Sequence, residues 1–233
     1  MNWFEPPSAE DTRSDTLAAQ VIVIAKEPVP GRVKTRLTPA VSPVMAAMLA
    51  EAALADTLDV VAATPVARRL LALDGVPGSW LPAGFDVIGQ QSGGLDERLA
   101  GAFAHAYAAV PLPMVLVGMD TPQVTRDLIE DAAQSLVSGE ADAVFGPAAD
   151  GGFWLLGLRR PDRSLLAGVP MSVPETGRVQ LDRLYSAGLR VALAPQLTDV
   201  DVFDDAERVA GEIPNSRFAA AFRLAMDGCT VRG

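Results

Sequence analysis

The sequence predicts an α/β protein of three layers, with a mostly parallel sheet between two layers of helices. Short apolar runs rich in β-branched residues alternate along the chain with longer stretches of helical spacing. Two of these runs, residues 21–25 and 113–118, are apolar on both faces, as is typical of central strands. No linker or repeat interrupts the 233 residues. We therefore expect one domain over residues 18–228, preceded by a flexible tail over residues 1–17.

The other elements follow from apolar spacing and from turn residues. Ser42 and Pro43 are a favourable N-cap and first residue for a helix that runs to about residue 59. Further helices are expected over residues 95–110, 125–137, 175–187, 204–211 and 216–226. Further strands are expected over residues 69–73, 85–89, 142–145, 153–158 and 189–193.

Composition excludes several classes of function. The formal net charge is −10, which disfavours nucleic acid and acidic membrane surfaces as partners. The single cysteine, Cys229, cannot form a disulfide framework, and no secretory signal or long apolar run is present, so we expect a cytoplasmic protein. The only histidine, His105, cannot build a zinc site alone, and we expect a surface or packing residue.

A basic loop follows the first predicted strand. It places four cations within eleven residues of an acidic protein: Lys26, Arg32, Lys34 and Arg36. Gly31 allows close backbone approach, so we expect the loop to bind a di- or triphosphate, with Lys34 and Arg36 supplying charge. A solvated basic loop is the alternative. A Walker loop is disfavoured because Val33, and not glycine, precedes Lys34, and the GxGxxG dinucleotide motif is absent.

Asp120 follows the second strongly apolar strand. Because ligands of such sheets bind beyond the carboxyl ends of the strands, Asp120 is expected in the same crevice as the basic loop. Mg²⁺ or Mn²⁺ commonly uses one or two protein carboxylates together with phosphate oxygens, so Asp120 is the first predicted metal ligand. An Asx turn or a helix N-cap is the alternative.

Two later acidic segments are weaker candidates. Asp150, before Gly151 and Gly152, would be a second metal ligand or would position the acceptor, whereas Asp-Gly is equally typical of a hairpin turn. Asp201 lies in the last acidic loop, and its role stays open. Asp205 and its neighbour Asp204 more simply favour a helix N-terminus.

Four segments together resemble a known family: AKEPVPGRVKTRL, GMDTP, GPAADGGFWLLGL and DVDVFDDAERV. In this order they resemble a bacterial family of GT-A-fold proteins labelled glycosyltransferases, some of them linked to arsenosugar biosynthesis. The resemblance spans roughly residues 21–208. More distantly, the chain is similar to the guanylyltransferases that act on 2-phospholactate or on the molybdenum cofactor.

The resemblance implies a GT-A, nucleotide-diphospho-sugar transferase-like fold and assigns roles by position. The basic loop would bind phosphate, Asp120 would bind the metal, and Asp150 matches the family's aspartate before paired glycines. A segment before a helix would contact the base, through Gln91, Gly93 and Gly94. That segment departs from the family, which commonly reads GDLGERL where this chain has GGLDERL. A second departure is at Asp120, which lies between Met119 and Thr121 where the family often has a small residue and a serine or cysteine.

These features predict a transferase that depends on Mg²⁺ or Mn²⁺. It would take a nucleoside triphosphate or nucleotide sugar and a small-molecule acceptor, with Lys34, Arg36 and Asp120 as catalytic residues. Nucleotidyl transfer is slightly favoured, because Gly118 stands where many sugar transferases of this fold have the first acid of an Asp-x-Asp pair. The alternatives are a glycosyltransferase and an inactive nucleotide-binding or scaffold protein.

Overall fold

A computed structural model describes residues 16–38 and 40–230. Their strands form one seven-stranded sheet in the order β3-β2-β1-β4-β6-β5-β7, in which β6 is antiparallel to its neighbours and every other pair is parallel. The strands are β1 (Leu17–Lys26), β2 (Val66–Asp74), β3 (Asp86–Gly89), β4 (Met114–Gly118), β5 (Ala143–Pro147), β6 (Phe153–Leu158) and β7 (Val191–Leu193). The predicted mostly parallel sheet is confirmed.

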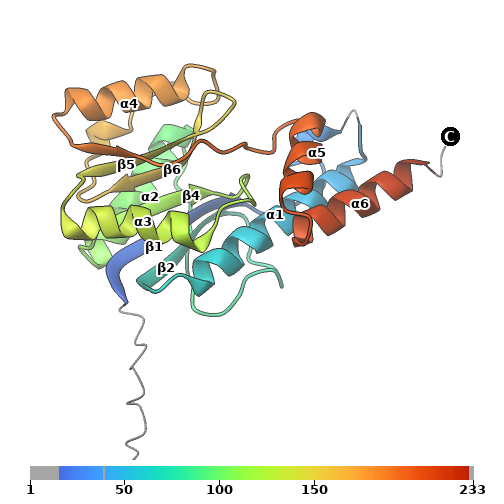
Figure 1. Cartoon of the computed structure of the whole chain (residues 1–233), viewed down its shortest axis with the longest axis horizontal. Helices are drawn as coiled ribbons and strands as arrows, with labels where there is room; N and C mark the ends of the chain where they lie inside the picture. The colour runs from blue at the N-terminus through green and yellow to red at the C-terminus, as the bar shows by residue number, and fades with distance from the viewer. Residues whose placement is uncertain (1–15, 39, 231–233) are drawn as a thin grey trace, which may run out of the picture.

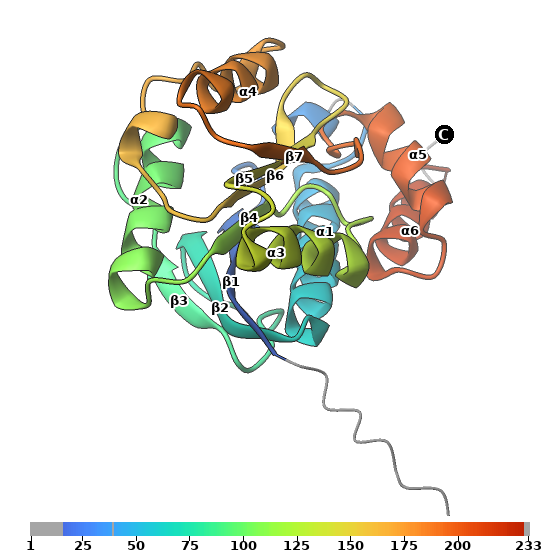
Figure 2. The same ribbon diagram turned by 60° about the vertical axis from the view of Figure 1, so that its left-hand side comes forward.

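Helices cover both faces of the sheet (Figures 1 and 2). On one face, α1 (Pro43–Ala63) and α3 (Arg126–Ser138) share a core with Val21 and Val23 of β1. On the other, α2 (Leu95–Ala109) and α4 (Thr176–Ser186) share a core with Ile22. Alternate residues of a strand point to opposite faces, so the run 21–25 of β1, apolar on both faces, requires these two helical layers.

Two further helices extend the molecule at one end of α1 (Figure 1). α5 (Phe203–Glu212) and α6 (Arg217–Thr230) pack with α1 in a third apolar cluster. The fully buried Leu37 belongs to the same cluster and ends a short 3₁₀ turn, η1 (Thr35–Leu37), that the sequence analysis did not anticipate. The third cluster therefore anchors the end of the basic loop.

The helix and strand limits follow the turn chemistry closely. Ser42 caps α1 by accepting a hydrogen bond from the backbone of Met45 at 3.3 Å, although α1 continues to Ala63 and so exceeds the expected length. β1 begins at Leu17, inside the stretch expected as a tail, while residues 1–15 of that stretch lie outside the described residues. His105 is exposed on α2, as expected. In the described part of the chain, no helix has both the length and the apolarity to cross a membrane.

Candidate active site at the carboxyl edge of the sheet

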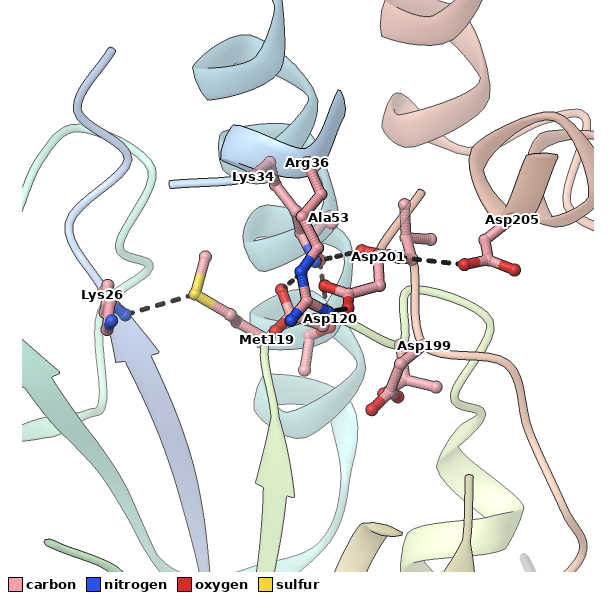
Figure 3. A network of polar contacts seen from close by, with 12 residues as sticks. Lys26, Lys34, Arg36, Ala53, Met119, Asp120, Asp199, Asp201 and Asp205 are labelled. Carbon is pink, nitrogen blue, oxygen red and sulfur yellow. Dashed lines mark hydrogen bonds and ion pairs between the residues drawn. The ribbon is translucent and has the colours of Figure 1, made fainter. Parts of the chain in front are cut away.

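The basic loop and the Asp120 loop meet because β1 and β4 are parallel neighbours in the sheet. Each loop leaves the carboxyl end of its strand, where side chains of adjacent loops can face one another. Lys34 Nζ lies 2.6 Å from Asp120 Oδ1, which joins the two loops by an ion pair (Figure 3). The expected meeting of the basic loop with this carboxylate is therefore present in the structure.

Lys34 is held tightly for a lysine. Its side chain is only 6% exposed, and Nζ also donates to the backbone carbonyl of Val200. The backbone of Lys34 is left-handed, with φ 48° and ψ 37°, a conformation that residues other than glycine rarely adopt. Val33 is buried in the main core and Leu37 in the third cluster, so apolar anchors fix the loop on both sides of Lys34.

A partly buried acid that the sequence analysis did not single out, Asp199, lies beside this pair. Asp199 Oδ1 accepts a hydrogen bond from Thr121 Oγ1 at 2.8 Å. Burial raises the pKa of Asp199 to about 7, and the neighbouring Asp120 and Asp150 carboxylates also raise it, whereas the Thr121 hydrogen bond and the Lys34 charge lower it. The only available signal was the alternation of acids after the last strand, which does not tell which of them faces the site.

Hydrogen bonds fix the last acidic loop against the Asp120 loop. The backbone amide of Val200 donates to the Asp120 carbonyl at 2.8 Å, and Gln123 Nε2 donates to the Thr198 carbonyl at 2.7 Å. These bonds join segments almost eighty residues apart in the chain. They explain how a loop after the short β7 comes to border the site.

Arg36 forms the second ion pair of the basic loop, with Asp201 (Figure 3). Its side chain is 65% exposed, so its guanidinium stands at the rim and not in the interior. Asp205 accepts hydrogen bonds from the backbone amides of Asp201 and Val202 at the start of α5, in agreement with its expected role at a helix N-terminus.

Asp150 lies at the turn between β5 and β6, in the hairpin that the sequence analysis kept as the alternative. Its Oδ1 accepts a hydrogen bond from the Gly152 amide at 2.8 Å, and its backbone turn bridges to the last acidic loop through Ala149 and Leu197. A chain this short between neighbouring strands requires antiparallel pairing, which accounts for the direction of β6. The position remains compatible with the site, because Asp150 is close enough to affect the pKa of Asp199.

The acidic residues of the site have the right chemistry for a hard divalent cation, but too few of them converge to hold one alone. Every candidate ligand is a carboxylate, the type of ligand that Mg²⁺ and Mn²⁺ favour, and Asp120 and Asp150 both lie close enough to Asp199 to raise its pKa. Within residues 16–38 and 40–230, however, no group of three or more acidic, histidine or cysteine side chains is arranged to hold a metal ion. The residues therefore fit a cation held by one or two carboxylates and completed by ligand oxygens.

The other predicted ligand-binding residues lie along the same edge. Lys26, Gly31 and Arg32 are exposed in the basic loop, and Gly31 has a φ of +78°. Gln91 packs against Gly101 of α2, and Gly93 and Gly94 are exposed before that helix. No hydrogen bond or ion pair joins residues 91–94 to the Lys34–Asp120 pair in the described part of the chain, so their proposed base contacts stay a prediction.

Two aromatic residues after Asp150 pack against the apolar clusters on the two faces of the sheet. Trp154 is 2% exposed, and its Nε1 donates to the Pro195 carbonyl at 2.9 Å. Phe153 contacts Phe145, with ring centroids 5.6 Å apart.

Known structures define the class of fold. The chain has the nucleotide-diphospho-sugar transferase fold, as the GT-A resemblance implied: it superposes on a "putative nucleotide-diphospho-sugar transferase" from Desulfovibrio desulfuricans G20 with a TM-score of 0.82 and 26% identity, over 92% of this chain and 97% of that one. The chain belongs to the family described as "Uncharacterized protein conserved in bacteria" (DUF2064), which matches residues 47–173.

Two more distant structures share the fold alone. One is CMP:2-keto-3-deoxy-manno-octonic acid synthetase complexed with CTP, with a TM-score of 0.52 and 14% identity over 84% of this chain and 98% of that one. The other is 4-diphosphocytidyl-2C-methyl-D-erythritol synthase, with a TM-score of 0.52 and 10% identity over 83% and 96%. No curated protein sequence matches the chain.

Proposed function

We propose that this protein is a transferase that binds a nucleoside triphosphate or a nucleotide sugar together with Mg²⁺ or Mn²⁺. One observation carries the proposal: a nearly buried lysine from the loop after β1 meets an exposed carboxylate from the loop after β4, at the edge where this class of sheet binds ligands. The D. desulfuricans structure, of the same fold and 26% identical, supports the transferase class.

Of the two possible reactions, we favour nucleotidyl transfer over glycosyl transfer. An acceptor phosphate or carboxylate attacks the α-phosphorus in line, and pyrophosphate leaves. Lys34 and Arg36 stabilise the charge that develops on the departing pyrophosphate, while Lys26 and Arg32 attract the triphosphate to the edge. Asp120, with Asp150 from the neighbouring hairpin, would hold the divalent cation, which neutralises phosphoryl oxygens when bound.

A glycosyltransferase is the second candidate, favoured by the name of the D. desulfuricans protein. The same cations and carboxylate would then hold a nucleoside diphosphate leaving group while an acceptor hydroxyl attacks the anomeric carbon. The resemblance to arsenosugar-linked glycosyltransferases and to guanylyltransferases stays a prediction of the sequence.

The test incubates the full chain with Mn²⁺ and a panel of the four nucleoside triphosphates and common nucleoside diphosphate sugars. Thermal shift identifies the nucleotide that binds, and released pyrophosphate or nucleoside diphosphate identifies the chemistry once acceptors are added. Asp120→Asn should abolish the metal-dependent shift, whereas the matched control Asp182→Asn, on an exposed turn of α4, should retain it. Binding with no product from any acceptor would favour the inactive binding protein, and no binding at all would refute the proposal.

A further inference from the structure

The two cations nearest the Asp120 edge are already neutralised by acids of the same chain. Lys34 pairs with Asp120 and Arg36 with Asp201, although the basic loop is proposed to act on phosphate. Figure 3 shows both head groups directed at the carboxylates, away from Lys26, whose backbone amide faces Met119. Without a ligand, Lys34 and Arg36 therefore form ion pairs with acids of the protein itself.

The Lys34 ammonium lies against Asp120 Oδ1, where a divalent cation bound to that oxygen would also have to lie. Nζ lies 2.6 Å from Oδ1, and hard divalent cations bind carboxylate oxygen at about 2.0–2.6 Å. An ammonium and a divalent cation at such separations repel one another strongly. The Lys34 side chain is only 6% exposed and Nζ also donates to the Val200 carbonyl, so its head group is held beside Asp120. Asp120 Oδ1 can therefore bind either the Lys34 ammonium or a divalent metal ion, but not both at once.

Release of Lys34 does not require the loop to refold. Val33 and Leu37 are buried anchors on either side, while the four methylenes of Lys34 let its head group turn. A polyphosphate placed at this edge offers Lys34 a new anionic partner at the moment that Asp120 becomes free for the metal.

We infer that the Lys34 ammonium competes with the divalent metal for Asp120, and that it leaves Asp120 when a phosphate ligand binds and pairs with Lys34 instead. The inference rests on the proposed function and adds the order in which the ligands bind. Divalent metal alone binds weakly, and metal and polyphosphate bind together. Because coupling between two ligands is reciprocal, each ligand then raises the affinity for the other.

The direct test measures Mn²⁺ alone, without nucleotide, by the electron paramagnetic resonance signal of the free ion. Lys34→Met should bind Mn²⁺ at least about tenfold more tightly than the wild type, because the competing charge is gone. Arg178→Met removes one positive charge from an exposed ion pair with Asp182 on α4, outside the candidate site, so its Mn²⁺ affinity should change less than about twofold. An unchanged or lower affinity in Lys34→Met, or an equal gain in both variants, would overturn the inference.

A second measurement uses the wild-type protein and does not depend on the variant folding. Lys26 and Lys34 are the only lysines in the sequence, so isotopic labelling of lysine gives two side-chain signals in NMR. In the free protein, the Lys34 signal should show a restrained head group and should resist Mg²⁺ alone, and it should move when Mg²⁺ and inorganic pyrophosphate are added together. A Lys34 signal as mobile as that of Lys26, displacement by Mg²⁺ alone, or no response to Mg²⁺ with pyrophosphate would contradict the inference.

The two proposals fail separately. If no nucleotide binds the wild type, the proposed function is refuted, and the Mn²⁺ titrations still decide whether Lys34 closes the metal position. If nucleotide and metal bind but Lys34→Met gains no Mn²⁺ affinity, the function stands and the closing role of Lys34 is refuted.

Discussion

The ion pair between Lys34 and Asp120 should stabilise the folded protein measurably, and a double-mutant cycle isolates its contribution. At the 2.6 Å separation of Nζ and Oδ1, Coulomb attraction amounts to about 1.6 kcal/mol at the dielectric constant of water and about 6 kcal/mol at an effective value of about 20. Asp120 is 43% exposed, so solvent screening places the pair toward the lower figure. We expect a coupling free energy of about 2 kcal/mol.

The assay is urea unfolding of the wild type, Lys34→Met, Asp120→Asn and the double variant at one ionic strength. A matched cycle with Arg178→Met and Asp182→Asn tests a pair that is 2.9 Å apart but more than 60% exposed on both sides, and its coupling should be about 0.5 kcal/mol or less. Equal couplings in the two cycles would refute the idea that Lys34 is held in a sheltered pair.

Three further predictions concern the supports of the site. Asp199→Asn should make the metal-free protein more stable at pH 8 than the wild type: the folded state keeps the Asp199 proton up to a pKa of about 7 while the unfolded state loses it near 3.8, so wild-type stability falls as pH rises between these values, by at most ~4 kcal/mol. Urea unfolding across pH 5–9 in EDTA should show a flatter profile for the variant, and parallel profiles would contradict the assignment. Leu37→Ala should cost ~2–5 kcal/mol in the same assay because Leu37 is fully buried, whereas Leu224→Ala, 62% exposed, should cost little; similar losses would argue against the anchor. Gly151→Ala should destabilise the β5–β6 turn by ~1 kcal/mol or more, because φ is +89° and a Cβ would lie 2.1 Å from the Pro174 carbonyl oxygen; an unchanged unfolding midpoint would show that the turn is not constrained.

Strong local signals made most of the fold predictable. The β1 run is apolar on both faces, and Ser42-Pro43 is good capping chemistry, so the first strand and the start of α1 are correct. The antiparallel β6 was not anticipated, because the strand pattern alone does not give direction. Only the short turn at Asp150-Gly151 indicates that β6 runs antiparallel to β5, and the same residues were also candidates for a ligand-binding loop.

The site was predictable where it depends on strand ends and unpredictable where it depends on contacts across the chain. Lys34 and Asp120 follow adjacent central strands, so the rule for ligand binding in parallel sheets brings them together. Asp199 depends on hydrogen bonds to the Asp120 loop from a segment almost eighty residues away. Burial, which gives Asp199 its unusual pKa, is a property of that tertiary contact and has no local pattern.

The most direct measurement is a crystal structure of the full chain with Mn²⁺ and the nucleotide that stabilises it most, with the metal located by anomalous scattering. We expect the anomalous peak at bonding distance from an Asp120 carboxylate oxygen, at about 2.0–2.3 Å, with Lys34 Nζ turned onto a phosphate oxygen. A peak elsewhere on the molecule, or phosphates bound away from the carboxyl ends of β1 and β4, would contradict the proposed site.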